Sequence, residues 1–247
     1  MTLRFRPLFA FGFFLSAALT SSKAVAANAH PDSDPELPKL LQEARTLIDN
    51  KKAQAAIEKC EKVIALFEAR YRNSKEKIYC ARTSEENLGY LLTAGADMSK
   101  GKFEKGKKNA VVLSSTWANA YYLKGWALEE LRKLAPARVA IKQAVELSPF
   151  NSHYLAELAY LYSLEKDWPQ AEKIYKSAEE HATLSPADVK QTELGRARRG
   201  LGYVLVELGR LDEAEKKYIQ CLKDDPNDQK AAAELEYVRD LKAKIRS

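Results

Sequence analysis

From residue 37 to the end of the chain, apolar residues recur at spacings of three and four positions, with polar residues between them. This spacing places the apolar side chains on one face of a helix, and the helix-favouring residues Ala, Leu, Glu and Lys dominate the same stretch. The pattern predicts an all-α domain over 37–247, without an internal boundary and without a β-sheet. Residues 27–36 are polar and contain two prolines, so we expect them to form a disordered linker.

The segments that begin at residues 118, 152 and 195 share one 34-residue arrangement of small and large residues. Small residues at positions 8 and 20 let two helices approach closely, and large residues at positions 11, 17 and 24 fill the space around this contact. A proline at position 32 ends the second helix in two of the segments. Each segment is therefore predicted to form a helical hairpin. Five small residues are expected at buried helix crossings: Gly125, Ala137, Ala171, Gly202 and Ala214.

This arrangement resembles that of the tetratricopeptide repeat, a helix–turn–helix unit. The resemblance implies a right-handed superhelical solenoid of antiparallel helix pairs. Residues 229–247 carry an apolar stripe and are expected to form a C-terminal capping helix. In one of the weaker copies, the bulky Phe103 takes the position of a small residue. The repeats are expected at 118–151, 152–185 and 195–228, and in weaker form at 37–70 and 84–117.

The repeat frame is interrupted twice, at 71–83 and at 186–194. Asn73 with Glu76 three residues later is typical of a helix N-terminus, and so is Ser185 followed by Pro186. We therefore expect each insertion to extend the following helix at its N-terminus by two or three turns.

The first 26 residues have the order of parts of a secretory signal peptide. Arg4 and Arg6 precede an apolar run over 7–20, and the segment 24–26 reads Ala-Val-Ala, which fits a cleavage site. The apolar run is shorter than the ~20 residues that span a bilayer as a helix. We predict cleavage after Ala26 and a periplasmic or secreted protein, with an uncleaved membrane anchor as the alternative.

The formal net charge of +6 would suggest a polyanionic partner. However, residues 1–26 contain three of the 40 basic residues and none of the 34 acidic ones, so the remaining charge does not favour nucleic-acid binding. No other stretch is apolar and long enough to be predicted as a membrane span. Residues 100–108 hold five lysines and one glutamate. They form either a docking patch for an acidic partner or anionic lipid headgroups, or a solvated turn.

No motif for catalysis is found along the chain. The three histidines are far apart, no His or Cys pair has metal-ligand spacing on a helix, and neither a nucleophile elbow nor a phosphate-binding loop occurs. Gly195, Gly200 and Gly202 suit helix packing better than a glycine-rich loop, because no strand precedes them. The sequence therefore predicts no enzyme activity, no cofactor, no metal and no small-molecule substrate.

Two of the three cysteines are candidates for a disulfide. Cys60 and Cys80 are expected on neighbouring helices, and in an oxidising compartment they could form a bond; two buried thiols are the alternative. Cys221 takes a small position of the repeat and is expected to be a buried thiol.

The resemblance to the tetratricopeptide repeat implies a binding site. In that family the first helix of each pair lines a concave groove, in which extended peptides or partner helices bind. The clamp for a chaperone's C-terminal carboxylate is absent, because Tyr122 and Trp126 occupy two of its positions. Some of the groove aromatics could instead pack between repeats. The candidate partner-binding residues are Asn119, Tyr122, Trp126, Glu129, His153, Tyr160, Arg196, Arg199 and Tyr203.

We therefore expect an exported, non-catalytic scaffold that binds a protein or peptide in this groove and serves protein assembly in the cell envelope. The alternative is a membrane-tethered assembly factor that keeps its signal segment as an anchor.

Overall fold

A computed structural model describes residues 30–246 of the chain. The expected signal peptide at 1–26 lies outside the described residues. The chain divides into two units, 1–34 and 35–247, of which the structure describes residues 30–34 and 35–246. In the first, Pro31–Ser33 form a 3-10 turn capped by the side chain of His30. The expected linker 27–36 thus contains a turn, and its last residue already belongs to the first helix of the second unit.

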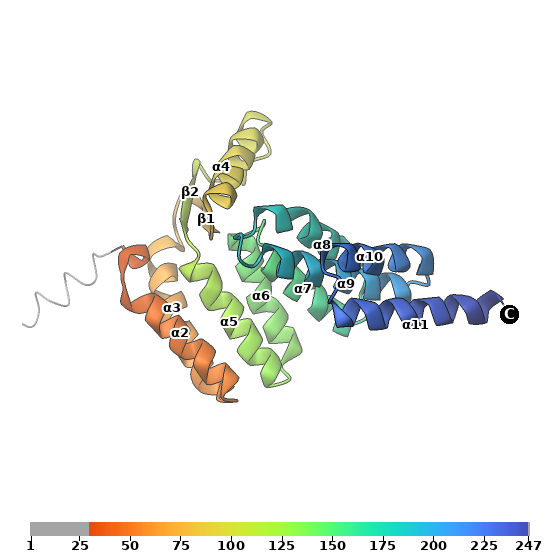
Figure 1. Cartoon of the computed structure of the whole chain (residues 1–247). Helices are drawn as coiled ribbons and strands as arrows, with labels where there is room; N and C mark the ends of the chain where they lie inside the picture. The colour runs from red at the N-terminus through yellow and green to blue at the C-terminus, as the bar shows by residue number, and fades with distance from the viewer. Residues whose placement is uncertain (1–29, 247) are drawn as a thin grey trace, which may run out of the picture. The chain divides into compact units, whose positions relative to one another are not determined.

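The second unit is built mainly of antiparallel helix pairs that stack in chain order (Figure 1). None of the described helices combines the length and the apolar character that a membrane crossing requires. The pairs are followed by a single helix, α11 (Gln229–Arg246), where the capping helix is expected. The four pairs are α2 (Glu36–Asp49) with α3 (Ala53–Tyr71), α5 (Thr116–Glu130) with α6 (Leu134–Leu147), α7 (Ser152–Leu164) with α8 (Trp168–His181), and α9 (Lys190–Glu207) with α10 (Leu211–Asp224).

The two helices of each pair cross at small residues. A Cβ atom on Gly125 would lie 2.4 Å from the side chain of Ile141, and one on Gly202 would lie 2.7 Å from the ring of Tyr218. The other small residues at the crossings are alanines with no exposed surface. The burial of all five predicted small residues is therefore confirmed: Gly125, Ala137, Ala171, Gly202 and Ala214.

A βαβ unit interrupts the row of helix pairs between α3 and α5. It consists of β1 (Glu76–Ala81), α4 (Ser84–Ser99) and β2 (Asn109–Ser114), and the two strands pair in parallel with Ile78 opposite Val111. We call residues 72–115 the insertion. Its strands correct three expectations: 71–83 does not extend a helix, 84–117 is not a helical hairpin, and the domain does contain a sheet.

The strands of the insertion alternate between two apolar surroundings. Ile78 and Cys80 pack into the core shared by the first helix pairs, whereas Tyr79 packs against Tyr90 of α4. A strand that is covered on both faces can be almost continuously apolar, and therefore does not show the clear polar alternation of a half-exposed strand. The two strands therefore lack the alternation by which a sequence predicts a strand.

Aromatic rings pack together where the insertion joins the end of α3 and the start of α5. The ring of Trp117, at the start of α5, lies 5.5 Å from that of Phe67 and 5.9 Å from that of Tyr71, both near the end of α3. The hydroxyl of Tyr121 donates a hydrogen bond to Glu68 at 2.6 Å. Because these rings hold α3 directly against α5, the row of pairs continues as if the insertion were absent.

The two interruptions of the repeat frame contact each other. The guanidinium of Arg82 lies 2.6 Å from the carboxylate of Glu193 and 2.9 Å from that of Glu86, and both carboxylates are buried. The hydroxyl of Ser185 donates to Glu193 at 2.6 Å instead of capping a helix. Helix α9 begins at Lys190. It is therefore extended at its N-terminus by about one turn and not by the predicted two or three. The second interruption therefore holds the insertion on the solenoid.

The three cysteines are all buried. The structure has no disulfide between Cys60 and Cys80. Burial raises the pKa of the Cys60 thiol to about 12 and that of the Cys221 thiol to about 11. Thiols with such pKa values are protonated near neutral pH and react slowly.

Candidate functional site: the groove on the first helices

A cavity of about 590 Å³ opens on the first helices of the last two pairs and on α11. We call it the α7–α11 groove. Its lining combines aromatic side chains with charged ones. The residues are Tyr160, Ser163 and Leu164 of α7, Arg196, Arg199, Gly200 and Tyr203 of α9, Lys230 and Glu234 of α11, and Tyr175 and Tyr218 of the second helices.

The rim of the groove is apolar and accessible, whereas its floor is packed. Tyr160 and Tyr203 are 38% and 44% exposed. Tyr175 and Tyr218 on the floor are buried, and a Cβ atom on Gly200 would lie 2.3 Å from the ring of Tyr175. Burial raises the pKa of both floor tyrosines, so their hydroxyls are protonated at neutral pH. The groove thus offers two accessible aromatic rings over a rigid floor.

Most of the positive charge at the groove is already compensated within the chain. Arg196 forms an ion pair with Glu157 at 2.7 Å, and Arg199 pairs with Asp228. Lys230 is exposed and has no acidic partner among residues 30–246. A partner carboxylate would therefore find Lys230 available, whereas the guanidinium of Arg199 is already paired with Asp228.

Three predicted residues lie towards the N-terminal side of the groove and are mostly packed. Tyr122 is buried, with its ring 5.1 Å from that of Tyr154, so it belongs to the core and not to an accessible surface. Trp126 is half-buried, and the guanidinium carbon of Arg45 lies 5.6 Å from the centre of its ring. Glu129 is half-buried, and burial raises its pKa, with the nearby charge of Glu157 contributing.

His153 joins this packed region to the groove. Its ring meets that of Tyr122 edge-on, with centres 4.8 Å apart. Burial, with the positive charge of Arg196 as the next cause, lowers the pKa of His153 to about 4. Burial likewise raises the pKa of Glu157. Of the nine predicted residues, the structure brings together Tyr160, Arg196, Arg199 and Tyr203 in the groove, and it leaves the half-buried Asn119 outside it.

Four residues at or beside the site were not predicted: Arg45, Glu157, Lys230 and Glu234. The frame itself contained a signal for three of them. Arg45 takes position 9 of the repeat at 37–70, the same position as Trp126 in its own repeat. Residue 229 follows residue 195, the start of the last repeat, by 34 positions. Lys230 and Glu234 therefore take positions 2 and 6 of a further repeat, in its first helix. Helix α11 therefore lines the groove as well as covering the last pair.

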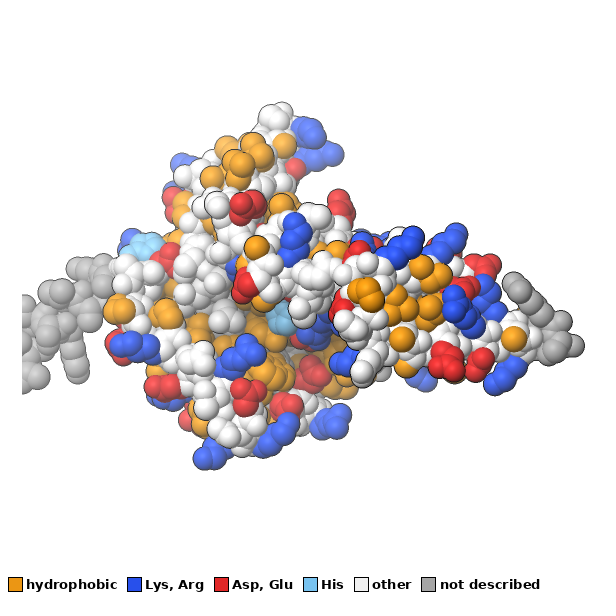
Figure 2. All heavy atoms as spheres, in the orientation of Figure 1, with side chains coloured by type: hydrophobic (Ala, Val, Ile, Leu, Met, Phe, Trp, Pro, Cys, Tyr) orange, Lys and Arg blue, Asp and Glu red, His pale blue; other side chains and the backbone are white. Residues whose placement is uncertain are grey.

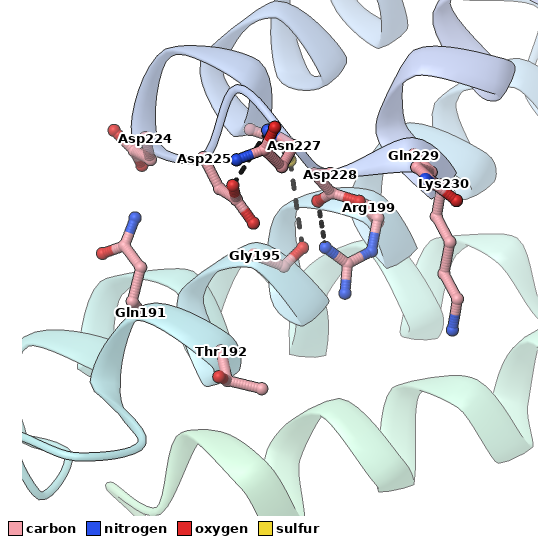
Figure 3. A pocket seen from close by; sticks show the side chains of 11 residues that line it. Gln191, Thr192, Gly195, Arg199, Asp224, Asp225, Asn227, Asp228, Gln229 and Lys230 are labelled. Carbon is pink, nitrogen blue, oxygen red and sulfur yellow. Dashed lines mark hydrogen bonds and ion pairs between the residues drawn. The ribbon is translucent and has the colours of Figure 1, made fainter.

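A second cavity, of about 420 Å³, lies where α9 meets the loop between α10 and α11 (Figure 3). Its carboxylates are engaged. Asp228 binds Arg199 and accepts a hydrogen bond from the backbone of Ala231, Asp225 accepts one from the backbone of Asn227, and Asp224 pairs with Arg198. Within residues 30–246, no group of three or more His, Cys, Asp or Glu side chains could hold a metal ion. This cavity therefore belongs to the packing contact between α9 and the loop that joins α10 to α11.

Comparison with known protein families agrees with this architecture. Two models of the tetratricopeptide repeat match the chain, one at 118–151 and one at 197–230. The first match has the bounds that the spacing predicts, and the second begins two residues later than predicted. These two segments therefore carry the pattern of the tetratricopeptide repeat. Comparison with curated protein sequences gives no match.

Solved structures with the same kind of fold cover most of the chain at low identity. TPR-like repeats from Podosopora anserina are 15% identical, with 88% of this chain and 98% of that chain covered and a TM-score of 0.51. MamA is 17% identical, with 85% and 86% covered and a TM-score of 0.49. The first TPR of Spaghetti, bound to an HSP90 peptide, is 22% identical, with 53% and 96% covered and a TM-score of 0.46. The first of these likenesses shows the fold, a TPR-like helical solenoid.

Proposed function

We propose that this chain is a non-catalytic protein-interaction scaffold, which binds an extended peptide or a partner helix in the α7–α11 groove. The observation that carries the proposal is the pair of accessible rings, Tyr160 and Tyr203, above a packed floor. A tyrosine buries a large area on binding and has few rotamers to freeze, which is why Tyr is frequent among the residues that dominate binding energy. The groove runs across three helices, so it suits an elongated ligand.

The charges of the groove favour a partner with an acidic residue near α11. Arg196 and Arg199 are paired internally, so they orient the floor and rim and add little net charge. Lys230 is the exposed cation that a partner carboxylate would meet. The attraction of a single exposed charge acts mainly on the association rate and weakens with salt.

A peptide selected against the purified chain provides the test. Tyr203→Ala should weaken its binding by about 2 kcal/mol, close to thirtyfold in Kd, and should lower the melting temperature only slightly, because the side chain is 44% exposed and contacts Trp168 with one edge. Val139→Ala on the outer face of α6 is the matched control, since Val139 is also an exposed apolar residue. Lys230→Glu should slow association more at low than at high salt. A double variant, Tyr160→Ala with Tyr203→Ala, that keeps full affinity would refute the groove as the site.

We also propose that the scaffold acts outside the cytoplasm, in the cell envelope, after removal of residues 1–26. The order of charged, apolar and small residues in this segment supports the proposal. N-terminal sequencing of the protein from fractionated bacterial cells should find Ala27 as the first residue. An intact N-terminus in the membrane fraction would instead support the tethered assembly factor.

A further inference from the structure

Helix α4 presents an unusual outer face. Leu88, Leu91, Leu92 and Met98 are all exposed, and Leu92 reaches 64% exposure. The opposite face of the helix packs on the sheet through the buried side chains of Glu86, Tyr90 and Ala94. Figure 2 shows hydrophobic side chains gathered on α4, next to Lys and Arg side chains at its far end.

The outer face of α4 carries no charge between its two ends. The helix follows Thr83, which caps it, and its acidic residues on the exposed side are limited to Glu85 in the first turn. Asp97 is half-buried and lies on the side of the sheet, where it faces Tyr79. Over residues 88–96 the exposed side chains are therefore apolar or small, and the hydroxyl of Thr93 is the one polar group among them.

A lysine-rich loop follows immediately. We call residues 100–108 the lysine loop. Glu104 is engaged by Lys77 at 2.6 Å, and Lys107 donates to the carbonyl of Ser74 at 2.8 Å. The remaining lysines are exposed and have no acidic partner among the residues that the structure describes: Lys100, Lys102, Lys105 and Lys108.

The surplus of positive charge is concentrated in the insertion. Residues 72–115 contain nine basic and five acidic residues, whereas the rest of the chain after Ala26 is nearly balanced. The basic residues without partners gather at the C-terminal end of α4, beside the apolar face. An apolar helix face joined to a basic cluster is the combination that binds the interface of an anionic bilayer.

We propose that the outer face of α4 and the lysine loop dock on the surface of an anionic phospholipid bilayer. The leucines and Met98 enter the boundary between headgroups and acyl chains, and the four unpaired lysines are attracted by the lipid phosphates. The solenoid is held on the other side of the sheet, so its groove stays in water. This inference concerns a different surface from the groove and does not depend on the proposed peptide binding.

A lipid surface fits this face better than a second copy of the chain. A helix of 16 residues is about 24 Å long and about 10 Å wide, so its outer face offers roughly 240 Å². A stable protein interface needs about 800 Å² on each partner. A bilayer has no such requirement, because it adapts to the shape of the side chains that enter it.

The proposal is tested with an environment-sensitive fluorophore on Leu92→Cys in the full chain. The native cysteines are buried, so the label goes to the new thiol. Vesicles of phosphatidylcholine with phosphatidylglycerol should shift the emission to the blue, whereas vesicles of phosphatidylcholine alone should not. The same label on Val139→Cys, an exposed position of α6, is the control and should not respond. This local readout separates binding by α4 from any binding by residues 1–26.

Two variants of the labelled chain measure the contributions. Exchanging Lys100, Lys102 and Lys105 for Gln should lower the affinity for anionic vesicles on the order of 100-fold, since each lysine near such a surface adds about fivefold. Leu88→Ser with Leu91→Ser should lower it about tenfold, without a change in melting temperature.

Three results would overturn the proposal. The label on residue 92 could fail to respond to anionic vesicles, or it could respond equally to neutral ones. It could also shift with protein concentration in the absence of lipid, which would identify a second copy of the chain as the occupant.

Discussion

Helix α9 of the helix pairs and helix α4 of the insertion have similar lengths, but they pack in different ways. Helix α9 packs on both neighbours and buries Leu201, Val204 and Leu205, whereas α4 packs on one side only and leaves four large apolar side chains in water. The difference is visible at the crossing positions 8 and 20. The pairs have only Gly or Ala there, as in Gly202 and Ala214, but the segment from residue 84 has Leu91 and Phe103.

A repeat frame alone does not establish that a segment forms a helical hairpin. Small residues at the contact let two helices cross closely, so Leu91 and Phe103 disfavour a hairpin of this kind in the segment from residue 84. The chain instead forms a strand over 109–114, which pairs with 76–81 and leaves α4 with a single packed face.

Arg82→Ala should release the insertion from the solenoid. The change leaves the buried carboxylates of Glu86 and Glu193 without their cation, which costs about 3–5 kcal/mol. Hydrogen exchange of the amides in β1 and β2 should accelerate, while that of α9 and α10 should stay slow. Arg72→Ala, which breaks an exposed ion pair with Glu68, is the control and should change little. Unchanged exchange in the strands of the Arg82 variant would contradict this account of the anchor.

A buried leucine of α9 and an exposed leucine of α4 should differ strongly in their contribution to stability. Leu201→Ala on α9 removes a side chain that is 1% exposed and should cost about 2–5 kcal/mol. Leu92→Ala on α4 should change stability by less than about 0.5 kcal/mol, because the side chain is in water. Thermal unfolding of the two variants gives the comparison. A large loss in the Leu92 variant would mean that this face is covered by another part of the chain.

Overfilling a helix crossing should have a smaller effect. Ala171→Leu places a large side chain between α7 and α8 and should cost about 1–3 kcal/mol. Ala96→Leu on α4 puts the same side chain on an exposed position and should be close to neutral. If both variants melt together with the parent chain, position 20 is not a crossing.

The pH dependence of the solenoid should reflect His153. Its pKa is about 4 in the folded chain, whereas an unfolded chain has the ordinary value of about 6.5. The folded state therefore binds fewer protons between these values, so the stabilisation is complete above pH 6.5 and is lost as the pH falls towards 4. Glu157 opposes this change at the acidic end, because burial raises its pKa and protonation then favours the folded state.

The matched measurement is the slope of stability between pH 6.5 and 5, which His153→Gln should flatten. The insertion contains no histidine, so its local opening, followed by hydrogen exchange and corrected for the intrinsic rate, should not share this slope. An unaltered slope in the His153→Gln variant would assign the pH dependence to other groups.

Part of the candidate site follows from the repeat frame. Tyr160, Arg196, Arg199 and Tyr203 come together because the frame orders the first helices side by side. The burial of Tyr122 could not be predicted from the sequence, since it depends on how closely α5 approaches Tyr154 of α7. The internal pairing of Arg199 with Asp228 depends likewise on the path of the loop before α11.

The helix pairs and their crossings follow from the amino-acid sequence, because the spacing of the apolar residues and the small residues at two positions act between neighbours in the chain. Only the tertiary structure decided the insertion and its anchor. The pairing of 76–81 with 109–114 and the contact of Arg82 with Glu193 join residues that are far apart in the chain, and neither strand is stable without the core beneath it. Contacts of that kind leave no local pattern, so they emerge only when the helices have been packed.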